Sequence, residues 1–497
     1  MSTTQRLRAT DLEAARPGDA AGAELGELGA LVGGRTVLSG AATEVRSPYD
    51  GRPVAVVHRA GPQEIEEAIT RAVQAFEETR RLPSWRRAEI LDRIADLIAA
   101  RRDELARTIA LEAGKPVKTA RVEAERASFT FRVAAEETKR IYGEIVPLDW
   151  APGLEGRTAH VRRVPLGPIV GISPFNFPLN LVVHKVAPAL AAGNPIVIRP
   201  ASQTPASALR LGQIVLEAGW PEGGIAVVPS STDVAAPLVE DDRIKMLTFT
   251  GSPAVGWALK ARAGRKRVTL ELGGNAGVIV NHDADVPFAA ERVAWGGFVY
   301  AGQTCISVQR VLLHTSIHDA FLEEFLPRVA ALRAGDPLDE DTDLGPLIDE
   351  GASARVAEWV DEALAGGAKA LAGGGHEGRL WEPTVLAGVD ESMKVSCQEA
   401  FAPLVVVSRF EDVEEAIAAV DRSDFGLQAG IFTRDWPTIS RAFDELEVGG
   451  LVVNDVPTFR IDHMPYGGVK QSGLGREGIR YAIEEMTEMK LLALNDR

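Results

Sequence analysis

The sequence predicts an α/β protein with two units of similar size, each a parallel sheet covered by helices. The 497 residues are more than one compact core holds, so we expect two or three domains. Between residues 168 and 252, apolar segments such as PIVIRP and GIAVVPS alternate with amphipathic segments such as ASALRLGQIVLEAG, which is typical of parallel sheets with right-handed crossovers. A second alternating series begins with AGVIVN at residue 276.

The N-terminal third is predicted to be mainly helical. Residues 1–35 are rich in Ala, Gly and Glu without a clear period, so we expect a weakly attached lead-in there. Apolar residues then recur at three- and four-residue steps over 64–80, 87–115 and 120–144, which predicts three helices. Gly114 and Pro116 end the second of them. Alternating character and turn residues predict an extended hairpin next, before residue 169.

The two alternating series place the remaining elements. In the first we expect strands over 168–175, 195–200, 224–230 and 244–252, with helices over 180–193 and 206–219 and a helix from Pro253. In the second we expect strands over 276–281, 310–317, 401–410 and 450–456, with helices over 287–302, 318–335, 353–368 and 413–424. We expect a cleft between the two units.

Charge and cysteine content exclude several function classes. The net charge of -16 argues against nucleic acid or an anionic membrane as a partner, although a local cluster of arginines can still bind an anion. No apolar run approaches the roughly 20 residues of a membrane span, and the first residues lack the apolar core of a signal peptide. The only cysteines, Cys305 and Cys397, have no partner at metal-ligand spacing, so we expect a cytoplasmic protein without disulfides or metal.

Three residues are candidates for chemistry, and each also has an ordinary structural explanation. Cys305, in AGQTCISVQR, lies between a predicted helix and a strand, where a cysteine is often a small buried apolar residue. Glu271, in VTLELGGNAG, ends an apolar strand; it is either solvated or placed as a general base at a domain junction. Asn176, in ISPFNFP, could simply stabilise a turn. The chain shows no dinucleotide-binding or P-loop glycine motif.

The combination of motifs is far more specific than any one of them. SPFNFP, FTGS, LELGG, GQTC, EAFAP and PYGGVKQSG follow one another from residue 173 to residue 473. In this order and spacing the chain resembles the aldehyde dehydrogenase superfamily, from about residue 40 to the C-terminus. The segments ISPFNFP, FGLQAGIFT and NDVPTFRIDHMPYGG resemble most the branch of lactaldehyde and non-phosphorylating glyceraldehyde-3-phosphate dehydrogenases.

The resemblance implies an aldehyde dehydrogenase-like fold with two α/β domains and a small β element for oligomerisation. It divides the chain into an NAD(P)-binding domain (1–142 and 166–273), a catalytic domain (274–477) and an oligomerisation element (143–165 and 478–497). The tail EMTEMKLLALNDR ends in an apolar run without an obvious partner in its own unit, so we expect it to pair with another subunit. A homodimer and a homotetramer both fit this expectation.

The resemblance also implies catalytic roles. Cys305 is placed as the nucleophile that forms a thiohemiacetal and then a thioester, Asn176 as the donor to the oxyanion, and Glu271 as the base that activates water. Lys185 resembles a lysine that relays protons, and the alternative is a solvated helix lysine. Because relatives that transfer the acyl group to coenzyme A commonly lack a carboxylate at the position of Glu271, hydrolysis to the acid is favoured. A CoA-acylating semialdehyde dehydrogenase and a non-catalytic binding or structural protein on the same fold are the alternatives.

Cofactor residues follow from the resemblance by position. It places the nicotinamide ribose near Glu399 and Phe401, and the pyrophosphate near Gly251 and Ser252 at a helix N-terminus. The same groove is lined by Ile172, Ser173, Pro174, Phe175 and Leu272. Where the family usually has Lys-Pro-x-Glu, this chain has Arg199 and Ser202. Loss of the glutamate removes a charge that would repel a 2′-phosphate, so we expect NADP or NAD to be used.

The substrate is predicted to be a small anionic or hydroxylated aldehyde. Two of the three arginines that gather the phosphate in related triose-phosphate enzymes match Arg126 and Arg460, while Thr304 occupies the third position. Arg126 has the alternative of a solvated helix residue. Phe177 and His184 are placed at the substrate mouth, where His184 replaces a residue that is frequently aromatic. Two cations in place of three weaken the case for a phosphate dianion.

Overall fold

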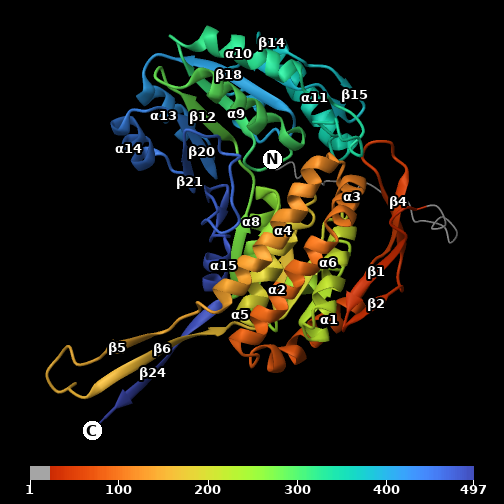
Figure 1. Cartoon of the computed structure of the whole chain (residues 1–497), viewed down its shortest axis with the longest axis vertical. Helices are drawn as coiled ribbons and strands as arrows, with labels where there is room; N and C mark the ends of the chain where they lie inside the picture. Colours follow the sequence, from red (N-terminus) through yellow and green to blue (C-terminus); the bar gives the residue numbers. More distant parts are fainter. Residues whose placement is uncertain (1–22, 497) are drawn as a thin grey trace, which may run out of the picture.

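The computed structural model describes residues 23–496 and contains two large sheets, with helices packed on them, and a projecting arm of three strands (Figure 1). One sheet has ten strands and the other has seven. The predicted architecture of two α/β units is therefore confirmed. Within residues 23–496, no helix combines the length and apolar character needed to cross a membrane.

The ten-stranded sheet has the order β23-β11-β10-β7-β8-β9-β1-β4-β3, with β2 added on β1. Its central strands β11, β10, β7, β8 and β9 run parallel, so their carboxyl ends share one edge. The strands are β1 (Glu27–Val32), β2 (Arg35–Val37), β3 (Ala42–Arg46), β4 (Pro53–His58), β7 (Ile169–Ile172), β8 (Ile196–Arg199), β9 (Ile225–Val227), β10 (Met246–Thr250), β11 (Arg267–Glu271) and β23 (Gly473–Leu474).

Both faces of this sheet are covered, which explains why its central strands, such as IVGI in β7 and IAV in β9, are mainly apolar. Successive residues point to opposite faces: Ile169 joins the core formed with α2 to α6, and Val170 joins the core formed with α1, α7 and α8. The helices are α1 (Pro62–Thr79), α2 (Ser84–Ala100), α3 (Arg102–Ala113), α4 (Val117–Thr138), α5 (Asn180–Ala192), α6 (Ala206–Glu217), η2 (Glu222–Gly224), α7 (Ala236–Glu240), α8 (Pro253–Arg262) and α15 (Ile479–Glu485).

The seven-stranded sheet has the order β14-β17-β18-β13-β12-β20-β21 and is parallel except for β14. Its strands are β12 (Ala276–Val280), β13 (Val308–His314), β14 (Lys369–Ala372), β17 (Thr384–Ala387), β18 (Leu404–Phe410), β20 (Gln428–Phe432) and β21 (Gly450–Val453). Its helices are α9 (Val286–Phe298), η3 (Val299–Gly302), α10 (His318–Ala330), α11 (Glu350–Ala365), α12 (Lys394–Cys397), α13 (Val413–Asp421) and α14 (Trp436–Glu445). Two short pairs complete the fold, β15 (His376–Glu377) with β16 (Leu380–Trp381) and β19 (Phe425–Gly426) with β22 (Val469–Lys470).

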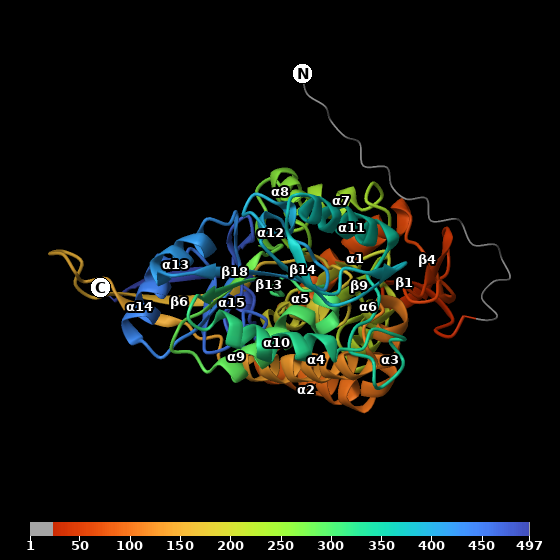
Figure 2. The ribbon, with the colours of Figure 1, turned by 90° about the horizontal axis from the view of Figure 1, so that it is seen from above.

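The arm consists of β5 (Glu144–Pro147), β6 (Arg157–Pro165) and β24 (Thr487–Asn495). The apolar run of the C-terminal tail was expected to have no obvious partner in its own unit, but it has one: β24 pairs with β6, a strand of the segment 143–165 with which the tail was grouped, from Thr487 opposite Pro165 to Asn495 opposite Arg157. The outer edge of β24 stays unpaired within the described chain, so pairing with another subunit remains a prediction. Figure 2 shows the arm on the side of the molecule opposite β1 and β4.

Two further expectations are corrected. Of the predicted lead-in, residues 1–22 lie outside the described residues, but residues 27–37 form β1 and β2, and Leu31 is buried in the core. The predicted helix over 87–115 is two helices that break at Arg101, which has φ -106° and ψ 19°. No Gly or Pro marks this break. Arg101 pairs with Glu217 at 2.6 Å, and Asp103 stabilises the start of α3 through the helix dipole.

A buried ion pair between Lys115 and Glu123 joins four segments of the chain. Glu123 on α4 also accepts hydrogen bonds from the backbone N–H groups of Leu179 (3.0 Å) and Asn180 (3.1 Å), which caps the start of α5. The Lys115 ammonium lies 3.5 Å from the centre of the Phe177 ring and 4.4 Å from that of Tyr300. One cation therefore holds the turn before α5 against the turn after α9.

We expect Lys115→Met to destabilise the protein by about 3–5 kcal/mol, because it leaves the Glu123 carboxylate buried without its counter-charge. Lys118→Met is the matched control, since Lys118 is partly exposed and its pair with Asp343 is worth no more than about 1 kcal/mol. Thermal unfolding of the two variants in parallel measures the difference. Equal midpoints would show that the buried pair contributes no more than the surface pair.

Candidate active site

The carboxyl edge of the first sheet faces the amino edge of the second. Only residues 272–275 separate the end of β11 from the start of β12. Glu271 ends β11, Asn176 follows β7, and Cys305 precedes β13. The three residues predicted to be catalytic therefore lie on different elements that converge on the junction of the two sheets, where open α/β sheets commonly bind their ligands.

Two glycines allow this close approach. A Cβ atom on Gly274 would overlap the carbonyl oxygen of Cys305, and one on Gly273 would overlap the carboxylate of Glu399. The Gly-Gly bend after Glu271 thus brings the bare backbone against the cysteine loop.

A strained turn carries Cys305 into the junction. Tyr300 and Ala301 have positive φ values of 52° and 51°, which are uncommon for residues with side chains and often mark functional sites. The Tyr300 hydroxyl donates to the Ala113 carbonyl at 3.0 Å and anchors the turn. Cys305 itself is partly exposed, and its sulfur lies 2.9 Å from the hydroxyl of Tyr466. Burial raises the pKa of the Cys305 thiol to about 12, against the lowering effects of Tyr466 and of the positive charge of Arg460.

Asn176 lies against the same turn. Its side-chain Nδ2 donates to the Gln303 carbonyl at 3.0 Å, two residues before Cys305. Gln303 is fixed in turn by Ile348 N–H, which donates to its Oε1 at 3.0 Å, and by the Pro346 carbonyl, which accepts from its Nε2 at 3.2 Å. Within residues 23–496 the second N–H of the Asn176 amide has no acceptor, so it is free to bind another one.

Glu271 is a buried acid without a partner. Neither carboxylate oxygen has a hydrogen bond within the described part of the chain. Burial, reinforced by the negative charge of Glu477, raises the pKa of Glu271 well above its ordinary value. Lys185, which was predicted either to relay protons or to be solvated, is fully buried; its Nζ donates to Thr250 Oγ1 at 2.6 Å and lies 3.4 Å from Glu477 Oε1. The solvated alternative for Lys185 is therefore wrong.

The predicted nicotinamide-side residues meet at the same junction. Gly274 N–H donates to Glu399 Oε1 at 2.9 Å, and burial raises the pKa of this carboxyl to about 7. Phe401, with a φ of 53°, places its ring edge-to-face with that of Phe175 at 5.9 Å between centroids. The hydroxyl of Ser173 is buried without a hydrogen-bond partner in residues 23–496.

The predicted phosphate side has free donors and unpaired cations. Helix α8 begins after Ser252 without a side-chain cap, which leaves its first N–H groups available to an anion. Arg199 Nη2 donates to the Ser230 carbonyl at 3.1 Å, while its buried Nε has no partner. Arg59 lies close enough for its charge to add to the effect of burial in lowering the pKa of Arg199. Within residues 23–496, no carboxylate pairs with either of these two guanidinium groups.

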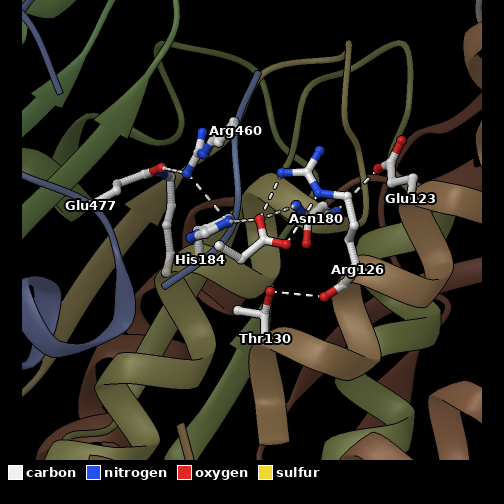
Figure 3. Close-up of polar contacts among 9 residues, drawn as sticks. Glu123, Arg126, Thr130, Asn180, His184, Arg460 and Glu477 are labelled. Atoms are coloured by element: carbon white, nitrogen blue, oxygen red, sulfur yellow. Dashed lines mark hydrogen bonds and ion pairs between the residues drawn. The ribbon is translucent and has the colours of Figure 1, made fainter. Parts of the chain in front are cut away.

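The predicted substrate cations are part of one network (Figure 3). Arg126 on α4 binds Asp462 through Nε at 3.1 Å and Nη2 at 2.6 Å. His184 Nε2 lies 2.9 Å from Asp462 Oδ1 and 3.3 Å from Arg460 Nη2, so it stands between the two arginines. Arg460 in turn donates to Glu477 at 2.8 Å.

The other two residues predicted to bind the substrate, Thr304 and Phe177, have different surroundings. Thr304 is buried, and its hydroxyl has no partner in the described chain. The Phe177 ring packs edge-to-face on Tyr300, with the centroids 6.1 Å apart.

Comparison with known proteins identifies the family. The family model described as "Aldehyde dehydrogenase family" matches residues 37–492. The chain belongs to the aldehyde dehydrogenase family. The family, the fold and the oxidoreductase class predicted from the motifs are thereby confirmed, and the non-catalytic alternative is not favoured.

Named relatives cover almost the whole of this aldehyde dehydrogenase. It is 44% identical over 470 residues to a 3-sulfolactaldehyde dehydrogenase of Priestia aryabhattai, which covers 94% of this chain and 98% of the relative. It is 40% identical over 461 residues to a lactaldehyde dehydrogenase of Methanocaldococcus jannaschii, covering 91% and 97%. The solved structure of aldehyde dehydrogenase 21 from Physcomitrella patens with succinate superposes with a TM-score of 0.92 at 41% identity, covering 95% and 98%.

Four polar residues of this aldehyde dehydrogenase site were not found by sequence reasoning. Asp462 and Glu477 bind the predicted cations, Tyr466 contacts the cysteine sulfur, and Arg59 stands beside Arg199. Asp462 and Tyr466 lie within a segment already singled out, NDVPTFRIDHMPYGG, so their polar types offered a signal. Arg59 offered none, because it lies far from Arg199 in the sequence; the backbone N–H of its neighbour Ala60 donates to the Pro229 carbonyl at 2.7 Å.

Proposed function

We propose that this aldehyde dehydrogenase oxidises a small aldehyde with an anionic or hydroxylated end to the carboxylic acid, with NADP or NAD as oxidant. The observation that carries the proposal is the convergence of a partly exposed Cys305, the Asn176 amide and the unpaired carboxyl of Glu271 at the junction of the two sheets. These groups supply a nucleophile, an oxyanion donor and a base within one site.

Cys305 attacks the aldehyde carbonyl as the thiolate, which is the nucleophilic form. The oxyanion that develops takes hydrogen bonds from the free N–H of Asn176 and from the backbone N–H of Cys305, which has no acceptor in residues 23–496. One such donor is worth about 3–4 kcal/mol of transition-state stabilisation. Bound NAD(P) supplies the acceptor for the hydride, and the carbon is left as a thioester on Cys305.

Glu271 opens the thioester by taking a proton from water. The carboxyl must be ionised for this, so its raised pKa makes hydrolysis faster as the pH rises through that pKa. The raised pKa of Glu271 disfavours its charged form, which lessens its repulsion of the Cys305 thiolate. A buried base at this position supports water, and not coenzyme A, as the acyl acceptor.

Several hydrogen-bond donors without partners and cations without carboxylate partners in residues 23–496 suit a bound dinucleotide. Ser252 and the uncapped start of α8 suit the pyrophosphate. Arg199 and Arg59, with Ser202 in place of an acid, suit a 2′-phosphate. Solved relatives include a glyceraldehyde-3-phosphate dehydrogenase of Methanocaldococcus jannaschii complexed with NADP, which is 40% identical with a TM-score of 0.87 and covers 91% of this chain and 98% of that one. We infer that NADP is bound at least as well as NAD.

The charge balance of the mouth limits the substrate. Arg126 is paired with Asp462, and Arg460 with Glu477, so little net positive charge remains. Each guanidinium still has N–H groups that these carboxylates do not use. This arrangement suits a hydroxyl or a monoanion such as a sulfonate or carboxylate better than a phosphate dianion. The relatives named for sulfolactaldehyde and lactaldehyde support the same class.

We expect Cys305→Ser to abolish aldehyde oxidation while cofactor binding persists, because an unassisted hydroxyl is a far weaker nucleophile. Glu271→Gln should give a burst of reduced cofactor followed by a slow steady rate that no longer rises with pH. Stopped-flow absorbance at several pH values measures both variants. Cys397→Ser, which removes the other cysteine, is the control and should keep wild-type turnover; turnover in Cys305→Ser near that of this control would refute the assignment.

Arg59→Ala should raise the KM for NADP by roughly 10- to 100-fold, as expected for the loss of a charge-assisted hydrogen bond. The KM for NAD should change little, because NAD lacks the 2′-phosphate. Arg140→Ala removes an exposed arginine at the end of α4 that pairs with Glu136 and Glu137, and serves as the control. Steady-state kinetics with both cofactors measures the two KM values. Equal effects on the KM for NAD and for NADP would show that Arg59 does not recognise the 2′-phosphate.

Arg460→Ala should lower kcat/KM for an anionic aldehyde by roughly 10- to 100-fold more than for propanal. The ratio of the two values cancels any loss that is common to both substrates, including damage to the packing around Tyr466. Sulfolactaldehyde, succinic semialdehyde and propanal form a suitable panel. An unchanged ratio would make Arg460 structural and would favour an apolar substrate.

A further inference from the structure

The sulfur of Cys305 has a polar neighbour that no step above uses. The hydroxyl of Tyr466 lies 2.9 Å from Sγ, and in residues 23–496 it is the only group that hydrogen-bonds to this sulfur. Tyr466 is 2% exposed, so water does not compete for its hydroxyl. Its ring packs with Ile306 and Leu427 against the cysteine, which fixes the oxygen beside the sulfur.

A cation lies over the ring of this tyrosine. The guanidinium carbon of Arg460 is 3.7 Å from the centre of the Tyr466 ring, and the bond to Glu477 holds it there. A positive charge over an aromatic face attracts its electrons and makes the phenol O–H a better hydrogen-bond donor. Backbone bonds between Tyr466 and Glu477 in both directions keep the ring and the ion pair in register.

We propose that Tyr466 is a catalytic residue that donates a hydrogen bond to the Cys305 thiolate and thereby promotes its formation. The proposal rests on the proposed function, in which Cys305 is the nucleophile. A neutral thiol is a weak donor and a weak acceptor, so its bond to the hydroxyl contributes little. A thiolate is a charged acceptor, and the same contact then becomes a charge-assisted hydrogen bond. The contact therefore favours the ionised form.

The tyrosine keeps its own proton in this arrangement. Burial, together with the neighbouring sulfur, raises the pKa of Tyr466 well above its ordinary value, so the O–H remains a donor at every working pH. The bond opposes the burial that raises the pKa of the Cys305 thiol. Tyr466 thus offsets part of the cost of placing a nucleophilic sulfur in a water-poor junction.

The test measures thiolate reactivity without aldehyde or cofactor. Full-length protein carrying Cys397→Ser has Cys305 as its only thiol, and iodoacetamide alkylates the thiolate with release of iodide. Tyr466→Phe should raise the thiol pKa by roughly one to two units, which reduces the thiolate fraction roughly 10- to 100-fold. The more basic thiolate is roughly 3- to 10-fold more nucleophilic, so alkylation at pH 8 should slow by roughly 3- to 10-fold.

Tyr481→Phe in the same background is the matched control. Tyr481 lies on α15 and is partly buried, and among the described residues the sulfur hydrogen-bonds to Tyr466 and not to Tyr481, so this variant should be alkylated at the parent rate. Thermal unfolding of both variants shows whether they are folded, which is expected because each loses one oxygen atom only. Equal alkylation rates for folded Tyr466→Phe and Tyr481→Phe would overturn the proposal.

The test of Tyr466 and the test of the proposed function can fail independently of each other. If Cys305→Ser retains aldehyde oxidation, Cys305 is not the nucleophile, yet the alkylation rates still report on the bond from Tyr466. If Cys305→Ser is inactive and Tyr466→Phe is alkylated at the parent rate, the nucleophile stands and the role of Tyr466 fails. In turnover, Tyr466→Phe should lower kcat/KM for anionic and neutral aldehydes by the same factor, which separates this role from substrate recognition.

Discussion

The buried ion pair between Lys115 and Glu123 is the contact on which the geometry of the site most depends. It connects the junction of α3 and α4 to the start of α5 and to the aromatic rings beside the catalytic candidates. Asn176 immediately precedes one of these rings, Phe177, and Cys305 follows the turn that carries the other, Tyr300. An ion pair of this kind is a poor source of net stability but costs much to break. Its contribution here is to position two loops from different sheets relative to each other.

The distribution of cations around the two buried acids, Glu477 and Glu271, gives them different roles. Glu477 binds both Lys185 and Arg460, and these cations hold its pKa at about 2 despite burial. Glu271 lies nearby without a hydrogen-bond partner in residues 23–496, and burial with the negative charge of Glu477 raises its pKa well above its ordinary value. Environments that push the pKa values of two acids apart in this way are typical of sites in which one acid is structural and the other takes up a proton. The identity of the base therefore depends on which acid the cations leave unpaired.

The sequence was sufficient for the alternating α/β order, because strands buried on both faces are mainly apolar and alternate with amphipathic helices. It was also sufficient to single out Cys305, Asn176 and Glu271 as candidates, through motifs that resemble the family whose model matches residues 37–492. Contacts between distant segments could not be read from it. The break at Arg101 and the approach of Arg59 to Arg199 depend on tertiary packing that leaves no local pattern, and the residue-by-residue register of β24 on β6 likewise came only from the structure.

The bend at Gly273 and Gly274 has a consequence for how such a site can evolve. A side chain at either position would displace Glu399 or the carbonyl of Cys305. The backbone at these two positions thus packs directly against its neighbours. What matters there is the absence of a side chain, and not a functional group. The residues at the mouth can be exchanged one by one to suit new substrates, whereas any substitution at the bend alters every alignment behind it at once. The freedom to substitute residues at the mouth and the lack of room for a side chain at the bend therefore follow from the same packing.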